Sequence, residues 1–304
     1  MGKTAFIFPG QGAQYSGMGK DIFDNNAAAR KAFMIIDSIR PGTSKQCFFG
    51  TEEELKVTEN TQPCIFATEI ALAQALKEEG ILPDAVAGFS LGEVTALTFS
   101  EVFSFENGFR FICNRAKYMQ EDAEKAEASM VAVVKLTNKQ VEELAQKFSM
   151  IFPVNYNCPG QLVVAGDKEQ LTEFSVLVKE NGGKAIPLAV GGGFHSPYMK
   201  NAAAKIKEDL AEKNFGSPLF PVYSNYTSYE YTEDVARLLS NQTNHPVMWN
   251  KLIENMIHNG IDTFVEVGPG KVLSGFVKKI SSDVRVFNVQ TQEDIVALKA
   301  QLIG

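Results

Sequence analysis

The fold of this chain is decided by residues 86–93, Val-Ala-Gly-Phe-Ser-Leu-Gly-Glu. The apolar run 85–89 predicts a strand that enters this stretch, and the pattern of 91–102 predicts a helix that leaves it. Ser90 at the bend has a glycine two residues before it and another two after it, which is the G-x-S-x-G pattern of a nucleophile elbow. Such a turn exposes the hydroxyl and places the N–H of Leu91 at a helix N-terminus, where it stabilises negative charge. A chance match is the alternative, but the flanking strand and helix favour an activated serine.

The composition is that of an ordinary globular protein. The 304 residues are 45% hydrophobic and 21% charged, which is enough for one large domain or two. A net charge of −7 argues against a general nucleic-acid binder. No apolar run reaches the length of a membrane span, and because a strand is predicted from residue 4 onward, we expect no signal peptide. We therefore expect a cytoplasmic protein whose four cysteines are reduced thiols.

A glycine-rich turn, residues 8–14, follows the first predicted strand. Open α/β sheets bind ligands at the carboxyl ends of their strands, so this turn is a candidate for ligand contact. It does not match the dinucleotide-binding pattern G-x-G-x-x-G, because Tyr15 stands where the third glycine belongs. We expect a cradle of backbone donors here and no dinucleotide site.

The next predicted helix, 105–125, contains an arginine on its apolar side. At 100° per residue one face collects Phe105, Phe109, Ile112, Ala116 and Met119. Arg115 falls inside the apolar arc, where an unpaired charge is costly, so we expect an anionic partner for it. That partner is either a bound substrate or a local glutamate, or else the side chain extends outward to solvent. The pattern alone leaves these alternatives open.

Residues 128–192 form a subdomain of their own in the predicted pattern. Strands and helices follow one another there in the order β-α-β-β-α-β, which is typical of a ferredoxin-like fold. Strands and helices then alternate to the end of the chain. The predicted fold is a large α/β-hydrolase-like domain with a parallel sheet, residues 1–127 and 193–304, into which the ferredoxin-like subdomain is inserted.

His195 is the best candidate among three histidines for a general base. It follows a run of glycines and precedes Ser196, a suitable N-cap, so it lies just outside a helix N-terminus. There the helix dipole favours the neutral imidazole that a base requires. His245 precedes a proline and His258 lies in an amphipathic helix, settings that favour packing or surface roles. A serine and a histidine together indicate acyl transfer or hydrolysis through an acyl-serine.

Five motifs in this order resemble the malonyl-CoA:acyl carrier protein transacylases of bacterial fatty-acid synthesis, and equally the acyltransferase domains of polyketide synthases. They are Gly10–Gln14, Gly88–Glu93, Asn114–Ala116 with Met119–Gln120, Gly193–Ser196 and Glu266–Gly270. The resemblance spans nearly the whole chain, including the inserted subdomain. It implies that Ser90 is the nucleophile and that His195 is its base and later the acid.

The resemblance also implies the roles of the residues around this pair. The backbone N–H groups of Gln11 and Leu91 would form the oxyanion hole. Arg115 would bind the free carboxylate of malonate. Of the alternatives given above for Arg115, the resemblance therefore favours a bound substrate. The carbonyl of Met248 would orient the histidine.

Three positions bear on selectivity in the light of the resemblance. Phe194 matches the malonyl-selective members. Phe89 stands where the family usually has histidine, and Ala116 stands where it usually has glycine. Both changes concern the choice of acyl group and leave the class of reaction as expected.

The activity expected from this resemblance is transfer of malonate from malonyl-CoA to the phosphopantetheine thiol of acyl carrier protein, without a metal or other cofactor. We expect a monomer that contacts malonyl-CoA, CoA and acyl carrier protein, but no nucleic acid or membrane.

Three alternative functions remain. Within the same family, the alternative is a stand-alone acyltransferase that serves a polyketide synthase. A serine esterase or thioesterase is disfavoured, because α/β-hydrolases place the acid after the serine and the histidine near the C-terminus. A silent scaffold that only docks carrier protein is disfavoured by the presence of Ser90, His195 and Arg115.

Overall fold

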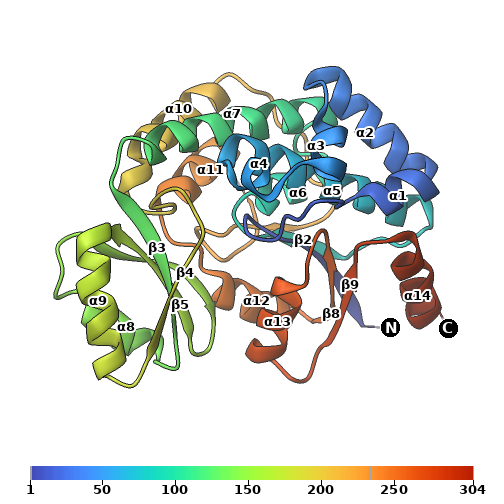
Figure 1. Ribbon diagram of the computed structural model, residues 1–304. Coiled ribbons are helices and arrows are strands. Elements are labelled where there is room, and N and C mark those ends of the chain that lie inside the picture. The colour runs from blue at the N-terminus through green and yellow to red at the C-terminus, as the bar shows by residue number, and fades with distance from the viewer. Residues whose placement is uncertain (1, 233, 304) are drawn as a thin grey trace. The chain divides into compact units, whose positions relative to one another are not determined.

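The computed structural model describes residues 2–232 and 234–303. The chain divides into two compact units, each considered by itself below (Figure 1). The first unit consists of Met1–Ala116, Asn214–Tyr223 and Met256–Gly304, and the second of Lys117–Lys213 and Ser224–Asn255. Each unit is built around one β-sheet.

The sheet of the first unit has five parallel strands in the order β7-β2-β1-β8-β9. Their bounds are β1 Lys3–Phe8, β2 Ala85–Gly88, β7 Val222–Tyr223, β8 Ile261–Val267 and β9 Arg285–Val289. In register, Ile7 of β1 lies between Ala87 of β2 and Glu266 of β8. Because all strands run the same way, the turns that follow β1, β2 and β8 meet at one edge of the sheet.

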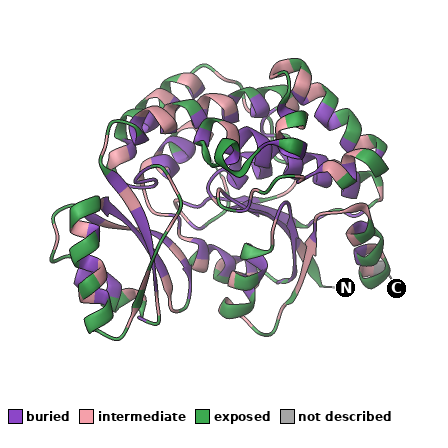
Figure 2. Ribbon diagram, viewed as in Figure 1, coloured by how far each residue is buried: buried purple, intermediate pink, exposed green. Residues whose placement is uncertain are grey.

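The helices of the first unit surround a central one, α5 (Thr58–Glu78), which is buried on nearly every side (Figure 2). α5 packs against α2, α3, α4 and α6. The other bounds are α1 Lys20–Asn25, α2 Ala27–Ile39, α3 Thr43–Phe49, α4 Glu52–Lys56, α6 Gly92–Phe99, α13 Val272–Ile280 and α14 Gln292–Ile303. Helix α7, Phe105–Ala123, begins in the first unit and ends in the second.

The second unit contains an antiparallel sheet in the order β4-β5-β3-β6, which is the ferredoxin-like arrangement. The elements are β3 Ala128–Val134, α8 Asn138–Ala145, β4 Ile151–Cys158, β5 Gln161–Asp167, α9 Lys168–Glu180 and β6 Lys184–Pro187. Leu162, Val164 and Phe174 lie in the apolar core between this sheet and its two helices. The unit also holds the 3-10 turn η1 Pro197–Met199, α10 Lys200–Leu210, α11 Val235–Asn244 and the start of α12 Trp249–His258.

The predicted fold class is confirmed, with a parallel α/β sheet and a separate small antiparallel sheet. The predicted subdomain, 128–192, encloses the antiparallel sheet, and the second unit adds residues 117–127, 193–213 and 224–255 to it. Five described helices were not predicted, namely α1, α3, α4, α11 and α14. Within the described part of the chain, no helix combines the length and apolarity needed to cross a membrane.

Candidate active site

Ser90 lies in the turn that follows β2 and has a strained backbone conformation. Its φ is 55°, in the left-handed region that residues other than glycine seldom adopt. The flanking glycines allow the close approach that this turn requires. A Cβ on Gly88 would lie 1.9 Å from the Gly92 carbonyl, and a Cβ on Gly92 would lie 2.2 Å from the carbonyl oxygen of Phe8. The strand, the turn and the helix are therefore packed together as the elbow pattern predicts.

Two backbone N–H groups beside Ser90 make no hydrogen bond to any described residue. They belong to Leu91, the N-cap residue of α6, and to Gln11, in the turn that follows β1. Leu91 is buried, and a buried N–H without a partner is rare in native proteins. The two turns touch, because a Cβ on Gly10 would lie 2.8 Å from the carbonyl oxygen of Phe89. Both donors predicted for an oxyanion hole are thus available at adjoining turns.

Arg115 is buried on α7 with its guanidinium directed at the elbow. Its Nη2 donates to Oγ of Ser90 over 3.3 Å, and its Nη1 donates to Oε1 of Gln62 over 2.7 Å. Burial lowers the pKa of Arg115 to about 10, while the charge of Glu93 acts in the opposite direction. The guanidinium is still protonated at neutral pH, so a fixed positive charge lies beside the serine hydroxyl.

Gln62 is a site residue that the sequence analysis missed. It is buried on α5, most of whose residues are also buried. A polar amide at such a position needs a hydrogen-bond partner, and that requirement is the one signal in the sequence that could have revealed it.

His195 belongs to the second unit and also has a left-handed backbone, with φ of 59°. Its ring is buried, and Nδ1 lies 2.8 Å from the carbonyl oxygen of Gln242. A carbonyl only accepts, so Nδ1 carries the proton and Nε2 keeps the lone pair that a general base needs. Ser196 caps the following turn, since its side chain accepts from the N–H of Tyr198 over 3.3 Å.

The prediction that Met248 orients the histidine is wrong, because the carbonyl at Nδ1 is that of Gln242. The Met248 carbonyl accepts instead from the N–H of Leu252 over 2.9 Å, as a residue at the start of α12 should. Gln242 lies in the last turn of α11, where carbonyls lack partners within the helix and can serve another donor.

His195 lines a hollow of about 450 Å³ within the second unit. Phe152, Pro153 and Pro246 give it apolar walls, and Lys200 supplies a positive charge. A ligand in this hollow would therefore lie against His195. His245 also borders it, but its Nδ1 contacts the carbonyl oxygen of Asn241 over 2.9 Å, which suits the predicted packing role.

The two predicted selectivity residues lie in different units. Phe89 packs its ring against Phe276 of α13, with the centroids 6.5 Å apart. Phe194 is buried in an apolar cluster of the second unit that includes Met130 and Met199. The first unit therefore holds Ser90, Gln11, Leu91, Arg115 and Phe89, and the second holds His195, Phe194 and Met248.

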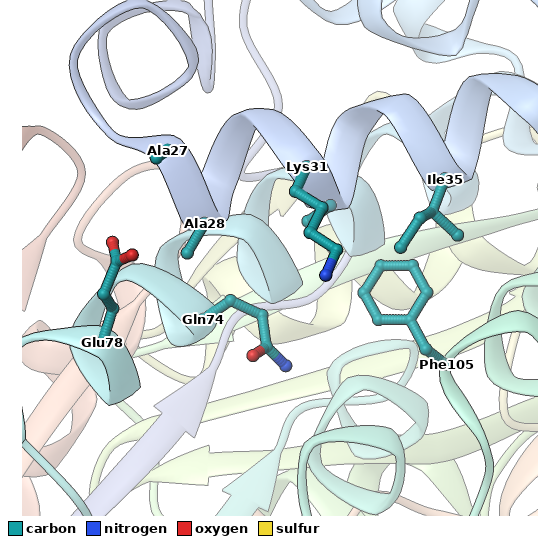
Figure 3. A pocket seen from close by; sticks show the side chains of 8 residues that line it. Ala27, Ala28, Lys31, Ile35, Gln74, Glu78 and Phe105 are labelled. Carbon is teal, nitrogen blue, oxygen red and sulfur yellow. The ribbon is translucent and has the colours of Figure 1, made fainter.

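A separate groove of about 460 Å³ crosses the surface between α2 and α5 (Figure 3). Lys31 of α2, Gln74 and Glu78 of α5, and Phe105 line it, and none of the site residues above takes part. Over residues 2–232 and 234–303, no group of three histidine, cysteine, aspartate or glutamate residues is placed to hold a metal ion.

Comparison with known proteins agrees with this geometry. The family model described as "Acyl transferase domain" matches residues 5–295. A malonyl CoA-acyl carrier protein transacylase of Bacillus subtilis (strain 168) is 39% identical over 303 residues, covering 97% of this chain and 96% of the relative. The crystal structure of the protein of that name from Clostridium perfringens superposes with a TM-score of 0.95 at 38% identity, covering 99% of this chain and 97% of that one. A malonyl-transacylase in complex with its type II PKS acyl-carrier protein, 31% identical, superposes with a TM-score of 0.95 over 98% of this chain and 99% of that one. The chain therefore belongs to the acyl transferase domain family and is an acyltransferase.

Proposed function

We propose that this protein transfers the malonyl group of malonyl-CoA to the phosphopantetheine thiol of acyl carrier protein, through a malonyl ester on Ser90. The observation that carries the proposal is the buried guanidinium of Arg115, 3.3 Å from the serine hydroxyl and bonded to Gln62. A fixed cation beside the nucleophile suits an acyl group that ends in a free carboxylate. The names of the relatives from Bacillus subtilis and Clostridium perfringens support the same substrate.

The first half-reaction loads the serine. Oγ of Ser90 attacks the thioester carbon while Nε2 of His195 takes the hydroxyl proton. The N–H groups of Gln11 and Leu91 stabilise the oxyanion of the tetrahedral intermediate. The intermediate collapses, the C–S bond breaks, and the CoA sulfur leaves with the proton that His195 returns.

The second half-reaction empties the serine by the same steps in reverse. The carrier-protein thiol gives its proton to His195 and its sulfur attacks the ester carbon. The Ser90 oxygen leaves and recovers the proton. The carbonyl of Gln242 keeps the imidazole in the required tautomer through both halves.

Arg115 supplies the preference for malonate over acyl groups that lack a carboxylate. An acyl group that ends in a carboxylate can form a charge-assisted hydrogen bond with this buried guanidinium beside Ser90, whereas a neutral acyl group cannot. Every catalytic group in these steps comes from the chain itself, so we propose that no metal or organic cofactor takes part and that the enzyme works as a monomer. We also propose that it works in the cytoplasm.

The carrier protein is expected to be acidic, which requires positive charge on this enzyme despite its net charge of −7. Helix α13 and the residue before it offer three exposed lysines, Lys271, Lys278 and Lys279, and no acidic residue. Lys117 is also exposed, on α7. A carrier of fatty-acid synthesis is the first candidate partner. A carrier of a polyketide synthase is the second, since a similar malonyl-transacylase was solved with one.

Mass spectrometry tests the acyl-serine. After mixing with malonyl-CoA, the intact protein should gain the mass of one malonyl group, and peptide mapping should place it on Ser90. Ser90→Ala should prevent the gain. An active enzyme with no adduct on Ser90 would falsify the mechanism. Adding carrier protein then separates transferase from esterase, since an esterase would release free malonate at the same rate with or without the carrier.

A further inference from the structure

Glu69 is a buried acid that the reaction steps above do not use. It lies on α5 with no exposed surface. The hydroxyl of Thr95 donates to Oε2, while Oε1 has no hydrogen-bond partner in the described part of the chain. Burial raises the pKa of this carboxyl well above its usual range, and the charge of Glu266 raises it further.

The second acid, Glu266, accepts hydrogen bonds from the first turn of α13. It is the residue before the last one of β8. Its carboxylate accepts hydrogen bonds from the N–H of Leu273 over 3.0 Å and from the N–H and hydroxyl of Ser274 over 2.8 and 2.6 Å. Burial raises the pKa of Glu266 as well, but these donors at the start of α13 act against that rise by stabilising its charged form. Because two neighbouring buried carboxyls resist ionising together, the negative charge belongs on Glu266 and the proton on Glu69.

Glu69 contacts the supports of both oxyanion donors. Thr95 lies on α6, the helix that begins at Leu91 and the elbow. On the other side, a Cβ on Gly268 would lie 3.0 Å from Cγ of Glu69 and 2.7 Å from the ring of Pro9. Pro9 opens the turn that carries the N–H of Gln11. Glu69 is therefore bonded to the helix that follows the elbow and packs close to Gly268, which in turn packs close to Pro9.

We propose that Glu69 is a positioning residue that joins Thr95 to the Gly268–Pro9 contact and so holds the N–H groups of Gln11 and Leu91 at the spacing an oxyanion requires. The inference rests on the function proposed above for this site. A group that acts through the oxyanion hole affects the transition state more than the bound substrate, so its loss lowers kcat and leaves KM nearly unchanged.

The test compares Glu69→Gln with Glu69→Ala. Glutamine keeps the shape and the neutral state, so kcat for malonyl transfer should stay within about threefold of wild type. Alanine should lower kcat by roughly 10- to 100-fold, less than or equal to the loss of a whole oxyanion donor, while KM for malonyl-CoA stays within about twofold. Glu78→Ala is the matched control, because Glu78 is exposed on the same helix and lines only the groove of Figure 3.

If Glu69→Ala does not fold, Thr95→Val provides a second test. It removes the hydroxyl that donates to Glu69 and keeps the shape of the side chain. It should lower kcat in the same direction with KM unchanged. The inference is overturned if folded Glu69→Ala or Thr95→Val keeps the wild-type kcat, or if Glu69→Gln loses as much as alanine does. Wild-type enzyme that forms no adduct on Ser90 would instead count against the proposed function.

Discussion

The charge on Arg115 gives the most direct test at the scale of single residues. Arg115→Ala removes one member of the ion pair expected with malonate, which typically costs about 2–5 kcal/mol. We expect kcat/KM for malonyl-CoA to fall by at least about 30-fold, the factor that corresponds to the lower of those energies. Transfer from acetyl-CoA should fall much less, because acetate has no free carboxylate. Equal losses with both substrates would make Arg115 a structural residue.

Gln62 is expected to support malonyl transfer by directing the guanidinium of Arg115. Gln62→Leu removes the 2.7 Å hydrogen bond that directs Nη1, and a bond to a charged group is worth about 1.5–3 kcal/mol. Malonyl transfer should therefore fall about tenfold or more. In the Arg115→Ala background the same change should cost less than in wild type, and a double-mutant cycle measures this coupling. Gln74→Leu, on the same helix but in the groove, is the control.

The sequence predicted the main residues of the site better than their supports. Ser90, Leu91 and Gln11 lie in short contiguous motifs, residues 88–93 and 10–14, which can be recognised from the sequence alone. Gln62 and Arg115 are 53 residues apart, and Gln242 and His195 are 47 apart, so their contacts appear only once the chain has folded. The error at Met248 has this origin.

At the scale of elements, the predicted helices and strands were those with long, regular apolar patterns. Helices α1, α3 and α4 have only five to seven residues, too few turns for periodicity to be read. Helix α11 has Asp234 as N-cap and apolar Leu238 and Leu239, but the next position on that face is the buried amide of Gln242. Gln242, which interrupts the apolar pattern, is also the residue whose carbonyl accepts the hydrogen bond from His195.

The glycines of the elbow and of α13 should respond in opposite ways to alanine. Gly88→Ala places a Cβ 1.9 Å from backbone and should destabilise the fold by more than about 3 kcal/mol. Gly275 lies inside α13 with nothing within 4 Å of an added Cβ, so Gly275→Ala should stabilise by about 0.5–1 kcal/mol. Thermal melting of both variants measures the difference. Similar midpoints for the two would contradict the close packing of the elbow.

At the scale of the whole molecule, the buried acid Glu69 should make stability depend on pH. Its pKa is raised in the folded state, so its contribution is complete below the unfolded value of about 4.5 and is lost as pH rises toward the folded pKa. Glu69→Gln cannot ionise and avoids that loss. The stability of the variant relative to wild type should therefore increase with pH.

Urea unfolding of wild type and Glu69→Gln at several values from about pH 5 to about pH 8 measures this trend. Glu78→Gln should run parallel to wild type, because that side chain is exposed and already solvated. A difference between Glu69→Gln and wild type that does not change with pH would show that Glu69 keeps its ordinary titration when folded.

The left-handed backbone at Ser90 and His195, with φ of 55° and 59°, means that heat resistance and activity compete in this enzyme. A side chain in that conformation costs about 1–2 kcal/mol, and glycine removes most of the cost. The Ser90→Gly variant should therefore be inactive, yet it should melt at a higher temperature than the wild-type protein. If calorimetry found it melting lower, the turn would be relaxed and not forced. Selection for thermal stability alone would favour glycine at position 90 and so remove the nucleophile. Serine is retained there for activity, at a cost in thermal stability.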